Sequence, residues 1–157
     1  MSIEQAIKQK RPFRNARQRA AVNLIYTHNW LQESMRDLLT PFDLTQKQYN
    51  VLRILRGAGE PLTTSVIRER LLDKMSDTSR IVDRLHQKGW VEKRICLSDK
   101  RLVDVSLSRE GSALLERLED LNPAIDGLLC RLTVEEAEQL SELIDKIRGC
   151  GQDLHRL

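Results

Sequence analysis

Apolar residues recur at helical spacing along most of this chain. Between Asn15 and Leu39 they form two separate stripes, because one set of side chains falls three, four or seven residues apart and a second set falls between them. The first stripe holds Ala20, Leu24, Leu31, Met35 and Leu38, and the second holds Val22, Tyr26 and Trp30. A helix with two apolar stripes needs two partners. We therefore expect one stripe to pack on the protein's own core and the other on a second subunit.

Three shorter helices are predicted in the next part of the chain. Thr45 and Gln48 have the spacing of a capping box, so a helix is expected to start there and to stop at the glycines of residues 57–59. A short helix is expected over residues 63–72 and a third over residues 76–88, which a glycine closes in the C′ position.

One stretch alternates between apolar and polar residues instead. Residues 90–95 and 102–107 predict two strands, and the turn between them carries Asp99, Lys100 and Arg101. The sequence thus predicts a β-hairpin with two cations at its tip.

Two more helices are expected after the hairpin. Ser108 is placed to cap the first of them, and Asn122 and Pro123 bend or interrupt it. Thr133 and Glu136 form a second capping box, which opens a final helix with apolar residues at near-heptad spacing. The fold class is therefore mainly α-helical with a small β-hairpin wing.

The order of the central elements matches a winged helix-turn-helix. Its second helix must fit a major groove about 12 Å wide. Small residues let that helix approach the bases, and arginines donate to base edges and phosphates. The candidate DNA-contacting residues of the helix over 76–88 are Ser76, Thr78, Ser79, Arg80 and Arg84. The cations at the hairpin tip would then reach the neighbouring minor groove.

Two quoted stretches carry a family resemblance. The run TSRIVDRLHQKGWVEKR at residues 78–94, followed by the Asp-Lys-Arg turn at 99–101 and by VSLSREG at 105–111, resembles the winged-helix core of the MarR family of bacterial regulators. The resemblance implies a single domain over 1–157, with the winged lobe at about 44–108 and dimerisation helices at about 13–40 and 109–157. It also implies a homodimer that binds double-stranded DNA at a palindromic operator.

Further roles follow only from the resemblance. Arg101 would enter the minor groove, Asp99 would orient it or brace the wing, and Lys100 would meet phosphate. Similar proteins bind a small aromatic or amphipathic effector where the first, second and fifth helices meet, and the nearest candidates here are Tyr26, His28, Trp30 and Arg36. The implied function is a transcriptional regulator, expected to be a repressor that the effector releases from DNA.

Each site residue also has a structural alternative. Arg80 and Arg84 lie close to Asp77 and Asp83, so a lattice of surface ion pairs would explain them. The serines and threonine can act only as helix caps, and Asp99 can simply start a tight turn. Tyr49 and Trp90 are expected in the core, because each sits within an apolar period.

Composition excludes several classes of protein. Hydrophobic residues make up 40% and charged residues 31% of the 157 residues, and no apolar stretch approaches the roughly 20 residues that span a bilayer. The first residues have no secretory pattern, so a cytoplasmic protein with no membrane partner is expected.

The sequence contains no nucleophile, zinc-protease or phosphate-loop motif, so no enzyme is expected. The scattered residues Cys96, Cys130, Cys150, His28, His86 and His155 suggest no disulfide, metal or cofactor.

Charge is distributed unevenly along the chain. Residues 1–62 hold 10 Lys and Arg against 5 Asp and Glu, whereas residues 109–157 hold 6 against 11. The basic run over residues 8–19 contains no acidic residue, and it is either a solvated arm or a contact to phosphate.

The alternative function for the whole chain is a winged-helix module that binds protein and uses the dimer as a scaffold.

Overall fold

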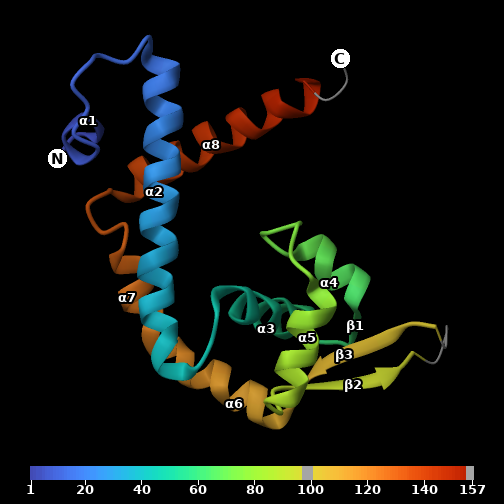
Figure 1. The fold of residues 1–157 in the computed structure, drawn as a ribbon. Helices are drawn as coiled ribbons and strands as arrows, with labels where there is room; N and C mark the ends of the chain where they lie inside the picture. The colour runs from blue at the N-terminus through green and yellow to red at the C-terminus, as the bar shows by residue number, and fades with distance from the viewer. Residues whose placement is uncertain (97–100, 155–157) are drawn as a thin grey trace. The chain divides into compact units, whose positions relative to one another are not determined.

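The computed structural model describes residues 1–96 and 101–154 of the chain, the last five by their backbone. It forms two compact units, Met1–Asp120 and Leu121–Leu157. Helices dominate both units, and the first unit also holds a small antiparallel sheet (Figure 1). The predicted fold class is therefore confirmed.

The predicted elements of the first unit occur in the predicted order. The unit comprises α1 (Ile3–Ala6), α2 (Ala16–Leu39), η1 (Thr40–Phe42), α3 (Gln46–Ala58), β1 (Leu62–Thr63), α4 (Thr64–Arg70), α5 (Thr78–Gln87), β2 (Val91–Ile95), β3 (Val103–Leu107) and α6 (Arg109–Leu118), with η2 (Glu119–Leu121) at its end. Among these, α1, η1 and β1 are present in addition to the predicted elements. The second unit holds α7 (Asn122–Gly127) and α8 (Val134–Leu154). Within the described residues, no helix has the length and apolar character needed to cross a membrane.

Side-chain caps set most helix boundaries. The capping box of Thr45 and Gln48 is present, because the Gln48 amide donates to Thr45 Oγ1 at 3.2 Å and the Thr45 amide donates to Gln48 Oε1 at 3.1 Å. The expected stop at Gly57 is wrong, since Gly57 lies inside α3 and the helix ends at Gly59 with φ 68°. The third short helix starts later than expected, because Asp77 caps it.

The second capping box is also present. The Glu136 amide donates to Thr133 Oγ1 at 3.2 Å, and the Thr133 amide donates to Glu136 Oε2 at 2.9 Å. The predicted interruption before it is confirmed, since α6 ends at Leu118 and α7 begins at Asn122 with Pro123 in its first turn.

The sheet has three strands in the order β1-β3-β2, all antiparallel. The predicted hairpin is formed by β2 and β3, with Val91 opposite Leu107 and Ile95 opposite Val103. Strand β1 was not predicted. It has two residues, and Leu62 pairs with Val105. So short a strand shows no alternation in sequence, and only pairing with β3 defines it.

The core of the first unit lies between α3, α4, α5, α6 and the sheet. Its fully buried side chains include Leu39, Leu52, Ile67, Val82, Leu85, Val105 and Leu115. Tyr49 is buried there, as expected, and the Arg53 guanidinium lies over its ring at 5.8 Å. Trp90 differs from the expectation, since it is only half-buried and the Lys88 ammonium lies 4.7 Å from its ring centroid.

One tight junction joins the hairpin to α6. Ser108 Oγ accepts from the Gly111 amide at 2.9 Å and donates to the Gly89 carbonyl at 2.6 Å, and the Ser108 amide donates to the Trp90 carbonyl at 3.1 Å. Gly111 faces that Trp90 carbonyl so closely that an added Cβ would overlap its oxygen. The junction therefore permits no side chain at position 111 without a backbone shift.

We predict that Gly111→Ala destabilises the fold by about 1–3 kcal/mol, because the new methyl group overpacks against the backbone of Trp90. Thermal or urea unfolding followed by circular dichroism measures the change. Gly57→Ala is the matched control, since nothing lies within 4 Å of a Cβ at that helical position. It is expected to stabilise α3 by about 0.5–1 kcal/mol. Equal effects of the two substitutions would contradict the close contact.

Candidate nucleic-acid interface

Helix α5 presents one apolar face to the lobe and one polar face outward. Val82 and Leu85 are fully buried, and the helix contacts α3, α4 and β2. Ser79, Arg80 and Arg84 are exposed on the other face. Burial of the two aliphatic side chains therefore determines which residues of α5 face solvent.

The two exposed arginines of α5 have no ion-pair partner among the described residues. The carboxylates close to them in sequence are engaged elsewhere. Asp77 Oδ1 accepts from the backbone amide of Arg80 at 3.1 Å, and Asp83 Oδ1 pairs with Lys93 Nζ of β2 at 2.7 Å. A lattice of ion pairs along α5 therefore does not account for Arg80 and Arg84.

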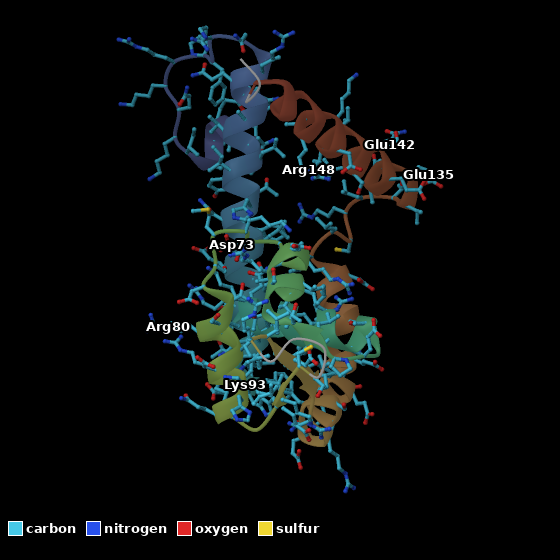
Figure 2. All side chains as sticks on the ribbon, turned by 90° about the vertical axis from the view of Figure 1, so that its right-hand side faces the viewer. Asp73, Arg80, Lys93, Glu135, Glu142 and Arg148 are labelled. Carbon is cyan, nitrogen blue, oxygen red and sulfur yellow. The ribbon has the colours of Figure 1, made fainter. Side chains whose placement is uncertain are left out.

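Figure 2 shows Arg80 pointing outward from α5, above Lys93 on the adjoining strand. The Lys93 ammonium ties the wing to α5 through Asp83, so the helix and the hairpin hold a defined relation. The donors of Arg80 and Arg84 remain available to a ligand with acceptor atoms, such as a phosphate or the edge of a base.

The hydroxyl residues at the start of α5 differ in their accessibility. Ser79 is exposed, whereas Ser76 and Thr78 are buried. Ser76 Oγ donates to Asp73 Oδ2 at 2.8 Å, and Thr78 Oγ1 lies 3.5 Å from the Ser76 carbonyl oxygen. All three border a polar hollow of about 260 Å³ that is also lined by Thr64, Ser65, Arg68 and Asp77. Ser79 is thus the most accessible hydroxyl of the predicted set.

The loop before α5 is held by Asp73. Its carboxylate pairs with Lys47 Nζ of α3 at 2.7 Å and accepts from Ser76 Oγ and from the Met75 amide, at 2.8 and 3.0 Å. Hydrogen bonding to Lys47, then to Ser76 and to the Met75 amide, lowers the pKa of Asp73 to about 2. These contacts connect the approach to α5 with the first turn of α3.

The wing carries further exposed charge. Glu92, Lys93 and Arg94 are exposed on β2, and Arg94 pairs with Glu92 at 2.8 Å. Arg101 is exposed just before β3, whereas Asp99 and Lys100 lie outside the described residues. The roles expected for these three residues stay predictions.

Two cavities border α2 and α3. The first, of about 540 Å³, is lined by Arg36, Lys47, Leu44, Ile81 and Arg84 with Gln32, Glu33, Thr40, Thr45, Gln46 and Gln48. The second, of about 710 Å³, is lined by His28, Lys47 and Asp73 among others. The structure thus divides the expected effector residues: Arg36 and His28 line different cavities. Tyr26 and Trp30 line neither of these two, and their side chains are 46% and 43% exposed.

Comparison with known proteins places these features in a family. A family model described as MarR family matches residues 42–102. The multiple antibiotic resistance protein MarR of Salmonella typhimurium is 34% identical over 128 residues, which cover 79% of this chain and 88% of that protein. The chain belongs to the MarR family.

Solved structures agree with this membership. A mutant MarR from Escherichia coli, crystallised with operator DNA, superposes with a TM-score of 0.72 at 29% identity, covering 80% of this chain and 91% of that one. A MarR transcription factor from Planctomyces limnophilus gives a TM-score of 0.65 at 29% identity, with 85% and 98% covered. As a MarR-family protein, the chain is a transcriptional regulator and not an enzyme.

Sequence reasoning missed two residues that support the MarR-type helix α5. Lys47 and Asp73 stand far apart in sequence, and each looks like an ordinary surface charge there. The local signal that could have revealed a structured turn is a carboxylate followed three residues later by a serine, at the start of the predicted helix. The pairing with Lys47 is visible only in three dimensions.

We predict that Asp73→Asn lowers the free energy of unfolding at neutral pH, because the ionised carboxylate is bound by Lys47. A carboxyl group with a depressed pKa in the fold stabilises it above the ordinary pKa of 3.8, and this contribution is lost as the pH falls through about 2. Urea unfolding at several pH values should therefore show the difference from wild type between pH 4 and 7 and its decline toward pH 2. Asp120→Asn, at an exposed position, is the control and should show no such trend. A difference that is constant with pH would contradict the assignment.

Proposed function

We propose that this protein is a repressor that binds a palindromic operator in double-stranded DNA as a homodimer and is released by a small effector. The observation that carries the proposal is the outer face of α5, where Arg80 and Arg84 stand exposed beside Ser79 without ion-pair partners in the described part of the chain. Guanidinium groups free of internal carboxylates are suited to bidentate contact with guanine edges and with phosphate.

The remaining site residues take roles that fit this placement. Arg80, near the start of α5, is assigned to a base edge, and Arg84, one turn later, to phosphate or a second base. Ser76 and Thr78 position the start of the helix, since their hydroxyls are buried. Arg101 is assigned to the minor groove, Asp99 to orienting Arg101 or bracing the wing, and Lys100 to phosphate. The operator complex of the Escherichia coli MarR mutant supports DNA as the target class.

Exposed apolar side chains support a dimer. Helix α2 exposes Leu24, Ile25, Tyr26 and Trp30, and α8 exposes Leu140, Leu143 and Ile147. Ile25 is 63% and Leu143 is 59% exposed in the single chain. A helix on the surface of a monomeric protein usually turns such large apolar side chains toward the core. A symmetric dimer covers them and presents two α5 helices to half-sites about 34 Å apart, which requires a palindrome.

The first cavity is the proposed effector site. Arg36, Lys47 and Arg84 contribute three cations and Glu33 one carboxylate to the lining, and Leu44 and Ile81 add apolar walls. Lys47 also pairs with Asp73 and Arg36 with Asp37, so Arg84 is the lining cation with no ion-pair partner among the described residues. This lining suits a small aromatic or amphipathic molecule that carries an anionic group. Because Arg84 belongs to α5, such a ligand favours the state in which that guanidinium is withdrawn from DNA, and it shifts the population away from the operator-bound form.

We predict that selection of bound duplexes from a random pool recovers a palindrome. On the recovered operator, Arg80→Ala is expected to cost about 1–3 kcal/mol of binding free energy and to relax the preference at one base pair of each half-site. Fluorescence anisotropy with single-base operator variants measures both effects.

Arg131→Ala is the matched control, because Arg131 is exposed in the second unit and is expected to leave the preference unchanged. DNA binding weakens steeply as the salt concentration rises. If the selection enriches no sequence and the affinity for DNA does not depend on salt concentration, the protein-interaction alternative is favoured.

We predict that benzoate, a simple aromatic anion, raises the melting temperature and weakens operator binding through the first cavity. Arg36→Ala should remove both effects, because it removes one of the three cations there. His28→Ala, in the second cavity, should preserve them. Thermal shift and anisotropy at increasing benzoate concentration distinguish the cavities, and the reverse result would move the effector site to the second one. Benzylamine, an aromatic cation, is the ligand control.

A further inference from the structure

The segment that follows α1, together with the first turn of α2, is a second cationic surface, distinct from α5. It comprises residues 8–17, named here the cationic loop, and its cations are Lys8, Lys10, Arg11, Arg14 and, within α2, Arg17. All five are exposed, and none has an ion-pair partner among the residues that the structure describes. No acidic residue interrupts the loop. This density of unpaired positive charge attracts a polyanion.

Contacts on both sides hold the cationic loop in place. Ile3 of α1 is buried, and Glu4 pairs with Arg19 of α2 at 2.5 Å, so the two ends of the segment are joined. The hydrogen bond from Arg19 lowers the pKa of Glu4 from its ordinary 4.5 to about 2, so the pair stays ionised in mild acid as well as at neutral pH. The Gln9 amide donates to the Glu4 carbonyl at 2.8 Å. A closed loop loses less conformational entropy on binding than a free arm.

The cationic loop lies at the end of α2 that is remote from α5. The last turns of α2 share a cavity with Arg84 of α5, whereas the loop adjoins the first turn of α2 (Figure 1). At 1.5 Å per residue, the 24 residues of α2 span about 36 Å. The loop therefore does not share the phosphates that α5 contacts.

Nucleic acid fits this loop better than other polyanions. Three of its five cations are arginines, whose planar guanidinium groups bind phosphate bidentately. An anionic membrane surface is less suited, because surface-binding segments insert a broad exposed apolar face. Within the loop the aromatic side chain of Phe13 is half-buried, and the neighbouring Ile7 is only 37% exposed. DNA is also the polyanion beside which the protein works, a point that rests on the proposed function.

We propose that the cationic loop binds DNA phosphates outside the stretch contacted by α5 and the wing. These phosphates belong either to the flank of the operator duplex or to a second duplex, and both present the same backbone chemistry. The protein thus has two DNA-binding surfaces, one selective for sequence and one not.

The test compares two variants with equal loss of charge. Lys10→Gln/Arg11→Gln removes two cations of the loop, and Arg131→Gln/Lys146→Gln removes two exposed cations of the second unit. Binding is measured by anisotropy on a 20-bp operator and on the same operator within 60 bp. Bridging is measured by energy transfer between two differently labelled duplexes. Binding of each variant to phosphatidylglycerol vesicles is measured as well, to test an anionic membrane as the ligand.

The loop variant is expected to bind the 20-bp operator as wild type does. If the loop binds the flank of the operator, the loop variant loses two phosphate contacts on the 60-bp duplex. The slope of log affinity against log salt concentration should then decrease in magnitude by about 1.8, so the fall in affinity between 50 and 200 mM salt becomes about 12-fold smaller. If the loop binds a second duplex instead, the loop variant should lose the energy transfer that reports bridging. The control variant should match wild type in both arms.

Three outcomes would overturn the proposal: no change in either DNA arm, the same change in the control variant, or loop-dependent binding to vesicles alone. Circular dichroism checks that both variants are folded. Failure of the proposed function is distinguishable, because in that case wild type shows no preference for the 20-bp operator and Arg80→Ala changes nothing there.

Discussion

The burial of Val82 and Leu85 is the interaction on which the surface proposed to face DNA depends. These side chains pack α5 against α3, α4 and β2, and the opposite face of the helix is therefore exposed to solvent. A helix of 10 residues is too short to be stable alone, so its tertiary contacts also determine that it forms. The outward position of the Arg80 side chain therefore follows from the packing of Val82 and Leu85 on the opposite face of the helix.

Competition for carboxylates then determines which cations remain available. Asp77 is engaged as a helix cap, Asp83 pairs with Lys93, and Asp73 pairs with Lys47. These three carboxylates thus bind the backbone or a lysine of a neighbouring element, and among the described residues Arg80 and Arg84 have no ion-pair partner. The same contacts make the lobe rigid at the helix start and at the wing, as binding to a fixed double helix requires.

Exposed positive charge is gathered at two places that differ in chemical character. On α5 it is sparse and lies next to small polar residues, an arrangement suited to the edges of bases. On the cationic loop it is dense and has no pattern of hydrogen-bonding partners, an arrangement suited to a uniform phosphate backbone. The pair of Glu4 and Arg19 closes the loop, so this second surface is organised as well as charged. Separation by the length of α2 allows both surfaces to act at once.

The sequence by itself determined the local features of this protein. Capping residues, proline and the change from helical to alternating periodicity predicted the helices, the hairpin and the exposed arginines, because each depends on neighbours within a few residues. Tertiary structure alone decided the rest. These are the strand β1, the pairing of Lys47 with Asp73, the close approach of Gly111 to Trp90, and the placing of Arg36 and His28 at two different cavities. Each depends on residues that are distant along the chain or separated by two turns of one helix. Local spacing carries no information on such contacts, since only the packing of whole elements brings them about.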